Sequence, residues 1–213
     1  MSPSRLRPEY GPTLPGLIAP LLARLSPAAQ RLVRVMAGAF VVLVVAAAIL
    51  WPRAHGFSHS GPAPFDLSYA RALTRVTPDP GGYLKLEQTR HGELVQSLEV
   101  SPVRLQPYQG DALGEVPVYA TGYIQSLAAR FPGFHLIGEG KTRVNGNPGY
   151  TILYTARLGA RAISARDDLF FQTGHRDGIA VQMLETPAAH IGGITLIGVN
   201  GPVGSTLQSL NLN

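Results

Sequence analysis

Residues Gly138–Arg157 read GEGKTRVNGNPGYTILYTAR, and this stretch decides the expected fold. In its second part, Tyr150–Leu158, apolar or aromatic side chains recur at every second position, the period of a β-strand with one buried face. They are Tyr150, Ile152, Tyr154 and Ala156. The preceding Asn145–Gly149, NGNPG, contains an Asn-Gly pair that is typical of a tight β-hairpin. We therefore expect two antiparallel strands joined by a short turn.

Short strand patterns and two helix patterns surround this hairpin. The further strands are expected at Phe65–Tyr69, Tyr83–Gln88, Leu94–Val100, Phe134–Ile137, Leu169–Thr173 and Ile179–Leu184. An amphipathic helix is expected over Val116–Phe131, where apolar residues recur every three or four positions. A shorter helix is expected over Pro202–Gln208, before a final strand at Ser209–Leu212. The sequence therefore predicts an α+β fold in which helices cover an antiparallel β-sheet.

The order of these elements resembles the PsbP/Mog1-like fold. The resemblance is carried by Gly114–Phe134 (GEVPVYATGYIQSLAARFPGF), by Gly138–Arg157 and by Gly201–Leu212 (GPVGSTLQSLNL). It covers about Phe65–Leu212 and implies an α/β/α sandwich, of the kind found in membrane-anchored bacterial domains of unknown function. It also implies a binding or assembly module rather than an enzyme. No catalytic motif comes with it, so no site residue is carried over.

A second feature, near the N-terminus, is the uncharged segment Val35–Trp51, VMAGAFVVLVVAAAILW. A helix of this length spans roughly 26 Å, close to the hydrocarbon core of about 30 Å. We expect a single transmembrane helix over residues 27–51, with Trp51 at the membrane interface. Two alternatives stay open. The segment is a cleaved signal peptide, for which Ala46-Ala47-Ala48 offers a small-residue site, or it is a buried helix of a soluble domain.

The charges on either side of this segment predict its orientation. Five arginines and one glutamate precede Val35, whereas Arg53 is followed by a long stretch without a second basic residue. The positive-inside rule then places the N-terminus in the cytoplasm and the C-terminal part outside the cell membrane. The expected organisation is a basic cytoplasmic tail (1–26), a transmembrane helix (27–51), a Pro/Gly/Ser-rich linker (52–64) and an extracytoplasmic α+β domain (65–213).

The composition excludes several classes of site. The chain of 213 residues has no cysteine, which excludes disulfides, thiolate zinc sites and cysteine nucleophiles. Most of the net charge of +5 precedes the apolar segment, so the charge reflects membrane topology and we expect no nucleic-acid partner. Gly138–Thr142, GEGKT, lacks the earlier glycine of a phosphate-binding loop, because His135 stands there. We expect no cofactor.

The densest polar group consists of Asp167, Asp168, His175, Arg176 and Asp177. Two carboxylates and a histidine suit a Mg²⁺ or Ca²⁺ site or acid–base chemistry. However, adjacent strand residues point to opposite faces, so Asp167 and Asp168 are not expected to converge. We favour a solvated hairpin in which Arg166 and Arg176 pair with acids across strands. We therefore expect no catalytic residue and no metal ligand.

The leading functional hypothesis is a single-pass membrane protein whose outer domain binds or scaffolds an envelope protein partner, without enzymatic activity. A tethered module reaches a high effective concentration near membrane partners. The alternative is an envelope hydrolase or small-ligand-binding protein that uses Asp167, Asp168 and His175 in a concave site. A third hypothesis, in which residues 1–34 contact a cytoplasmic signalling partner, ranks last because prolines interrupt that short tail.

Overall fold

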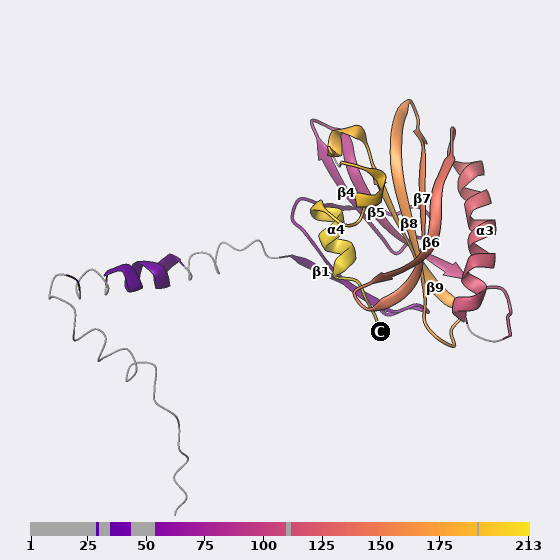
Figure 1. Ribbon diagram of the computed structural model, residues 1–213, viewed down its shortest axis with the longest axis horizontal. Helices are drawn as coiled ribbons and strands as arrows, with labels where there is room; N and C mark the ends of the chain where they lie inside the picture. The colour runs from indigo at the N-terminus through magenta and orange to yellow at the C-terminus, as the bar shows by residue number, and fades with distance from the viewer. Residues whose placement is uncertain (1–28, 30–34, 44–53, 110–111, 191) are drawn as a thin grey trace, which may run out of the picture. The chain divides into compact units, whose positions relative to one another are not determined.

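A seven-stranded antiparallel sheet forms the centre of the folded domain in the computed structural model (Figure 1). Its strands follow the order β3-β4-β5-β9-β8-β7-β6, which places β9 in the middle beside β5. The strands are β3 (Thr74–Val76), β4 (Leu84–Arg90), β5 (Glu93–Arg104), β6 (His135–Val144), β7 (Asn147–Leu158), β8 (Arg161–Phe171) and β9 (Asp177–Glu185). All neighbouring strands are antiparallel, which confirms the sheet type that the hairpin patterns predict.

The structure describes residue 29 and residues 35–43, 54–109, 112–190 and 192–213. The chain divides into two units, residues 1–51 and residues 52–213. In the first unit, residues 35–43 are helical and their side chains are exposed. None of the helices within the described ranges combines the length and the apolar character that crossing a membrane requires. The predicted tail and residues 27–28, 30–34 and 44–51 of the predicted span lie outside the described residues.

The predicted hairpin between β6 and β7 is confirmed. Val144 pairs with Asn147, so Asn145 and Gly146 form a two-residue turn. Both turn residues have positive φ angles, 45° and 83°, as the Asn-Gly pair favours. The side-chain amide of Asn145 also donates a hydrogen bond of 3.0 Å to the carbonyl of Leu210, which fixes the hairpin to the C-terminal segment.

A smaller three-stranded sheet corrects the predicted linker. It consists of β1 (His55–His59), β2 (Phe65–Tyr69) and β10 (Asn211–Leu212) in the order β1-β2-β10. The linker interpretation of residues 52–64 is wrong for β1, because β2 provides backbone partners for all five of its residues. Phe57 packs against the core, although its glycine, serine and histidine neighbours do not form a strand pattern by themselves.

Two α-helices and two short 3₁₀ turns complete the domain. Helix α3 (Ala112–Arg130) begins four residues before the predicted start, so Pro117 lies in its second turn rather than its first. Helix α4 (Gly201–Gln208) confirms the predicted short helix. The turns η1 (Pro187–Ala189) and η2 (Ile194–Leu196) lie between β9 and α4.

Each face of the large sheet carries its own hydrophobic core. One core joins the sheet to α4 and the small sheet, through residues that include Phe65, Leu98, Val181 and Leu207. The other joins the sheet to α3, through residues that include Val116, Leu127, Ile152 and Leu169. Figure 1 shows α4 and α3 on opposite sides of the seven-stranded sheet. The predicted α+β arrangement, with helices covering an antiparallel sheet, is therefore confirmed for the described domain.

A buried ion pair fixes the segment around η2 to the sheet. Asp168 on β8 is 0% exposed, and its carboxylate lies 2.9 Å from Nη2 of Arg166 and accepts a 3.0 Å hydrogen bond from Nε. The same guanidinium donates from Nη1 to the carbonyl of Ile197 at 3.1 Å. Burial raises the pKa of Asp168, whereas Arg166 opposes this rise. The ion pair with Arg166 is thus needed because the Asp168 carboxylate lies in the protein interior.

We expect Arg166→Met to lower the free energy of unfolding by about 3–5 kcal/mol, because it leaves the buried Asp168 carboxylate without its cation. The double variant R166M/D168L should recover most of that loss, since it removes both charges. Arg161→Met is the matched control, because Arg161 pairs with Glu93 at an exposed position and its loss should cost at most about 1 kcal/mol. Urea unfolding of the four proteins measures these differences, and equal losses for R166M and R161M would contradict the prediction.

Candidate functional site

The structure does not bring the predicted polar group together. Asp167 and Asp168 lie on opposite faces of β8, as expected, but both are 0% exposed, so the solvated-hairpin interpretation is wrong for them. The physical reason is that α3 covers one face of β8 and the segment around η2 covers the other. His175 is exposed in the turn between β8 and β9.

The two remaining members of that group also lie away from Asp167. Arg176 donates from Nε to the carbonyl of Leu105 at 3.0 Å. Asp177 forms an ion pair of 3.4 Å with Arg104, its partner residue across β5 and β9. The predicted pairing of arginines with acids across strands is therefore seen at Asp177, but with Arg104 rather than Arg166 or Arg176.

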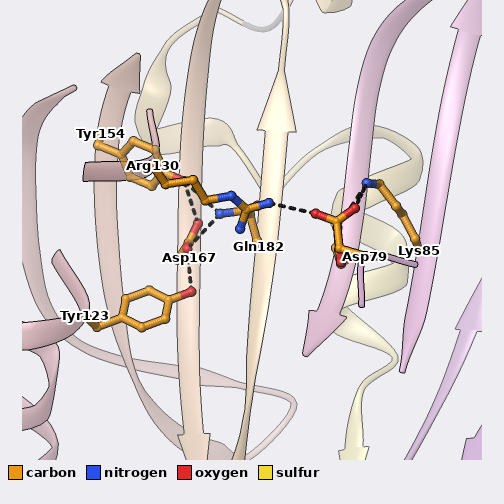
Figure 2. Close-up of polar contacts among 8 residues, drawn as sticks. Asp79, Lys85, Tyr123, Arg130, Tyr154, Asp167 and Gln182 are labelled. Carbon is orange, nitrogen blue, oxygen red and sulfur yellow. Dashed lines mark hydrogen bonds and ion pairs between the residues drawn. The ribbon is translucent and has the colours of Figure 1, made fainter. Parts of the chain in front are cut away.

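Asp167 instead forms a buried hydrogen-bond network with three side chains (Figure 2). Tyr123 of α3 donates its hydroxyl to Oδ2 at 2.8 Å, and Tyr154 of β7 donates to Oδ1 at 3.1 Å. Gln182 of β9 donates from Nε2 to Oδ2 at 3.1 Å and to the hydroxyl oxygen of Tyr154 at 3.0 Å. A helix and three neighbouring strands thus converge on one carboxyl group.

Burial determines the charge state of this network. It raises the pKa of Asp167 to about 7, although the hydrogen bonds from Tyr123, Gln182 and Tyr154 oppose the rise. Burial also raises the pKa of Tyr123 and Tyr154, and the nearby Asp167 carboxylate raises both further. The network therefore holds a carboxyl group whose protonated and ionised forms are both present near neutral pH, beside tyrosines that stay protonated.

A chain of charged groups lies beside the network. Arg130, at the end of α3, pairs with Asp79 at 2.8 Å, and Asp79 pairs with Lys85 at 2.7 Å. Lys85 also lies 3.3 Å from Glu99. A cavity of about 200 Å³ is lined by Asp79, Glu99 and Arg130 together with Tyr123 and Gln182 of the network. Figure 2 shows the Arg130 guanidinium pointing toward Asp79, away from its helix.

An apolar groove lies on the other side of Tyr123. It has a volume of about 460 Å³, and its apolar and aromatic lining residues are Leu105, Pro107, Val118, Tyr119 and Tyr123. Three polar residues, Gln106, Glu115 and Ser126, also line it. Val118 is 69% exposed, which is high for an apolar side chain on a helix that packs against a sheet. Tyr123 thus lines both a polar cavity and a mostly apolar groove on the α3 side of the sheet. We call this region the α3 face, defined by Leu105, Pro107, Val118, Tyr119, Tyr123 and Arg130.

The chemistry that these groups offer is recognition and proton exchange. Arg130 carries a charge that a partner acid can approach, and the groove accepts apolar or aromatic side chains. Asp167 already accepts three hydrogen bonds from the protein and has no exposed surface. Among the described residues, no three His, Asp, Glu or Cys side chains gather as a metal site.

The sequence analysis missed the network, although a signal was present. On the α3 side of β8, Asp167 stands between Ala165 and Leu169, which are both fully buried. On β9, Gln182 stands between the buried Ala180 and Leu184. A polar residue at an apolar position of a period-two pattern predicts a buried partner. The hydroxyls of Tyr154 and Tyr123 supply that partner for Asp167.

Comparison with known proteins gives matches among solved structures alone. No protein-family model matches the chain. No curated protein matches it either. The chain is similar to the solution structure of the cyanobacterial PsbP protein CyanoP from Synechocystis sp. PCC 6803, with a TM-score of 0.52 and 12% identity over 76% of this chain and 94% of that chain.

Two further structures are similar to the chain at low sequence identity. LpqN of Mycobacterium tuberculosis, which is described as involved in cell envelope biogenesis, matches with a TM-score of 0.51 and 8% identity over 75% of this chain and 91% of that chain. The Ran-binding protein Mog1p of Saccharomyces cerevisiae matches with a TM-score of 0.48 and 7% identity over 76% of this chain and 96% of that chain. The domain therefore has the PsbP/Mog1-like fold.

The raised pKa of Asp167 predicts that stability decreases as pH rises. An unfolded chain has an aspartate pKa of about 3.9, so between about pH 4 and pH 7 the folded state binds more protons than the unfolded state. The free energy of unfolding should therefore fall through this window, and Asp167→Asn should remove up to about 1.4 kcal/mol per pH unit of the slope. Urea unfolding at about pH 4.5 and about pH 7.5 measures it.

Two other carboxylates define the controls for this measurement. Burial also raises the pKa of Glu185 to about 7, so D167N should reduce the slope without abolishing it. Asp66→Asn should leave the slope unchanged, because hydrogen bonds from Ser58 and Asn213 lower the pKa of Asp66 and confine its effect to more acidic pH. A slope that is the same in D167N and the unmodified protein would contradict the assignment.

Proposed function

We propose that the chain is a single-pass membrane protein whose extracytoplasmic domain binds a protein partner in the cell envelope, and that it is not an enzyme. The anchor in this proposal is Val35–Trp51, whose uncharged sequence and preceding arginines favour a span with the N-terminus in the cytoplasm. The LpqN structure supports an envelope role by likeness of fold, because that protein is described as involved in cell envelope biogenesis.

The observation that carries the binding proposal is the composition of the α3 face. Protein interfaces are enriched in tyrosine and arginine and combine an apolar centre with a polar rim. Here Val118 borders the groove and is exposed to solvent, and Tyr119 and Tyr123 also line the groove. Arg130 and its partner Asp79 supply the polar rim at the end of the helix. The partner that fits is a protein segment with an apolar or aromatic anchor and an acidic group next to it.

The enzymatic alternative requires Asp167, Asp168 and His175 to lie close together, and the structure places them apart. Asp168 lies on the other face of the sheet from Asp167, and His175 is in an exposed turn. An enzyme built on Asp167 would use Tyr123 and Tyr154 as its neighbours, and a substrate would have to displace their hydrogen bonds to reach the carboxylate. The accessible groups on this side therefore favour recognition of a partner.

The anchor proposal predicts the behaviour of the chain in fractionated membranes. The full chain should stay with the membrane through washes in high salt and in carbonate, because the apolar span is held by burial in lipid rather than by charge. Deletion of residues 35–51 should release the folded domain into the soluble fraction. Release of the full chain by carbonate would contradict the anchor, and a shortened mature N-terminus would favour the cleaved signal peptide.

The binding proposal predicts position-dependent crosslinking in intact membranes. A photoreactive residue at Val118 should form a crosslinked product with an envelope protein, since Val118 borders the groove. Val199 is the matched control, because it is also an exposed valine, at 48%, but does not line the groove. Val118→Asp should reduce recovery of the partner at least about tenfold by adding a charge to the apolar contact, whereas Val199→Asp should not. Equal products from both positions would contradict the proposal.

A further inference from the structure

A second cavity lies at one end of the large sheet. Its lining residues differ in chemical character from those of the α3 face. It has a volume of about 330 Å³, which is at the lower end of the range for small-molecule sites. Strands β7, β8 and β9 provide polar lining residues, and the segment that carries η1 and η2 provides apolar ones. The polar residues are Thr155, Ser164, Glu185 and Thr186, and the apolar residues include Ile163 of β8 together with Pro187, Ile194 and Ile197.

The polar lining residues form one row across the sheet. Thr155 is paired with Ser164, Ser164 with Glu185, and Glu185 with Gln96 of β5. Side chains at paired positions point to the same face, with Cβ atoms about 4.5–5.5 Å apart. Four neighbouring strands thus place a hydroxyl, a second hydroxyl, a carboxylate and an amide side by side, and the first three border the cavity.

Glu185 has no partner in this row. The residue is 4% exposed, and its Oε1 atom is buried without a hydrogen-bond partner among the described residues. Burial alone raises its pKa to about 7. Gln96 is also 4% exposed, and its Oε1 atom likewise has no partner in the described part of the chain, although its amide donates to Gln88. Two adjacent side chains thus present acceptor oxygens without protein donors.

The position of Glu185 is fixed by the residue that follows it. Thr186 donates its backbone N–H to the carbonyl of Val95 at 2.9 Å. Its hydroxyl lies 3.1 Å from the carbonyl oxygens of both Leu94 and Val95. The end of β9 is therefore held against β5, which places the Glu185 carboxylate at the cavity wall. A buried carboxylate that is held in place without a donor is costly unless a ligand supplies one.

We propose that this cavity binds a small organic cation, with a primary ammonium group against Glu185 and an apolar portion against Pro187 and Ile194. An ammonium carries three N–H donors, which match the Glu185 carboxylate and the hydroxyl oxygens of Ser164 and Thr155. The opposite charge favours an ammonium over an alcohol, because a charge-assisted hydrogen bond is about twice as strong as a neutral one. A metal ion fits less well, since the described residues offer no second carboxylate or histidine at this position.

Isothermal titration of the full chain in detergent micelles, with propylamine, 1-propanol and propionate as probes, tests this proposal. Propylammonium should bind at least about tenfold more tightly than 1-propanol, and propionate should not bind, because only the first has both the charge and the donors. This comparison needs no variant, and micelles without protein correct for partitioning of the probes. Equal affinity for propylammonium and 1-propanol, or no binding of propylammonium, would overturn the proposal.

Two matched variants locate the binding. Glu185→Gln keeps the shape of the side chain and should weaken propylammonium binding at least about tenfold. Glu93→Gln is the control, because Glu93 is an exposed carboxylate that pairs with Arg161 and does not line the cavity. Circular dichroism shows whether both variants are folded. Unchanged binding in a folded E185Q variant would overturn the proposal, as would an equal loss in E93Q.

Discussion

The structure depends on how strand β8 accommodates two consecutive aspartates that are buried on opposite faces of the sheet. Asp167 points toward α3 and Asp168 toward the segment around η2, and both are fully buried. The two buried carboxylates are stabilised in different ways. Asp168 keeps a cation, Arg166, at 2.9 Å. Asp167 forms no ion pair with any described residue and instead accepts hydrogen bonds from two tyrosines and a glutamine. Burial raises its pKa to about 7. The contacts of each carboxylate also link a covering element to the sheet. Those of Asp167 hold α3, and those of the Asp168–Arg166 pair hold the segment around η2.

Local sequence patterns predicted most of the elements but not their environments. The Asn145-Gly146 turn and the alternation of Tyr150, Ile152, Tyr154 and Ala156 predict the β6–β7 hairpin, because both depend on residues close together in the chain. The same alternation places Asp167 and Asp168 on opposite faces. Their burial could not be predicted, since it depends on α3 and on residues 194–197, which are distant in sequence. Strand β1 was missed for a similar reason, because its backbone partners come from β2 and its own composition is that of a linker.

The candidate site was predicted only in part. The sequence indicated which residues share a face of the helix, but not which polar atoms are in contact. The helix pattern of residues 116–131 correctly grouped Val116, Tyr123 and Leu127 on the side of α3 that meets the sheet. It did not show that the Tyr123 hydroxyl reaches a carboxylate on β8, because periodicity describes which face a side chain occupies and not what its polar atoms contact. Arg130 and Asp79 are separated by 51 residues, and only the folded chain brings them to 2.8 Å. An ion pair of that kind has no local signature.

Burial raises the pKa of Asp167 and Glu185 to the same value of about 7, yet the two carboxyl groups suit different roles. The oxygens of Asp167 are occupied by donors from α3, β7 and β9, so its charge state affects how these elements hold together. Glu185 lies on the opposite face of β9 from Gln182 and has an oxygen without a donor beside a cavity. A cation bound there favours the ionised carboxylate, so its binding releases a proton near neutral pH. A partner bound at the α3 face meets a carboxyl group that already has its donors. We therefore propose separate ligands for the two faces of the sheet, a protein partner at the α3 face and an organic cation at Glu185.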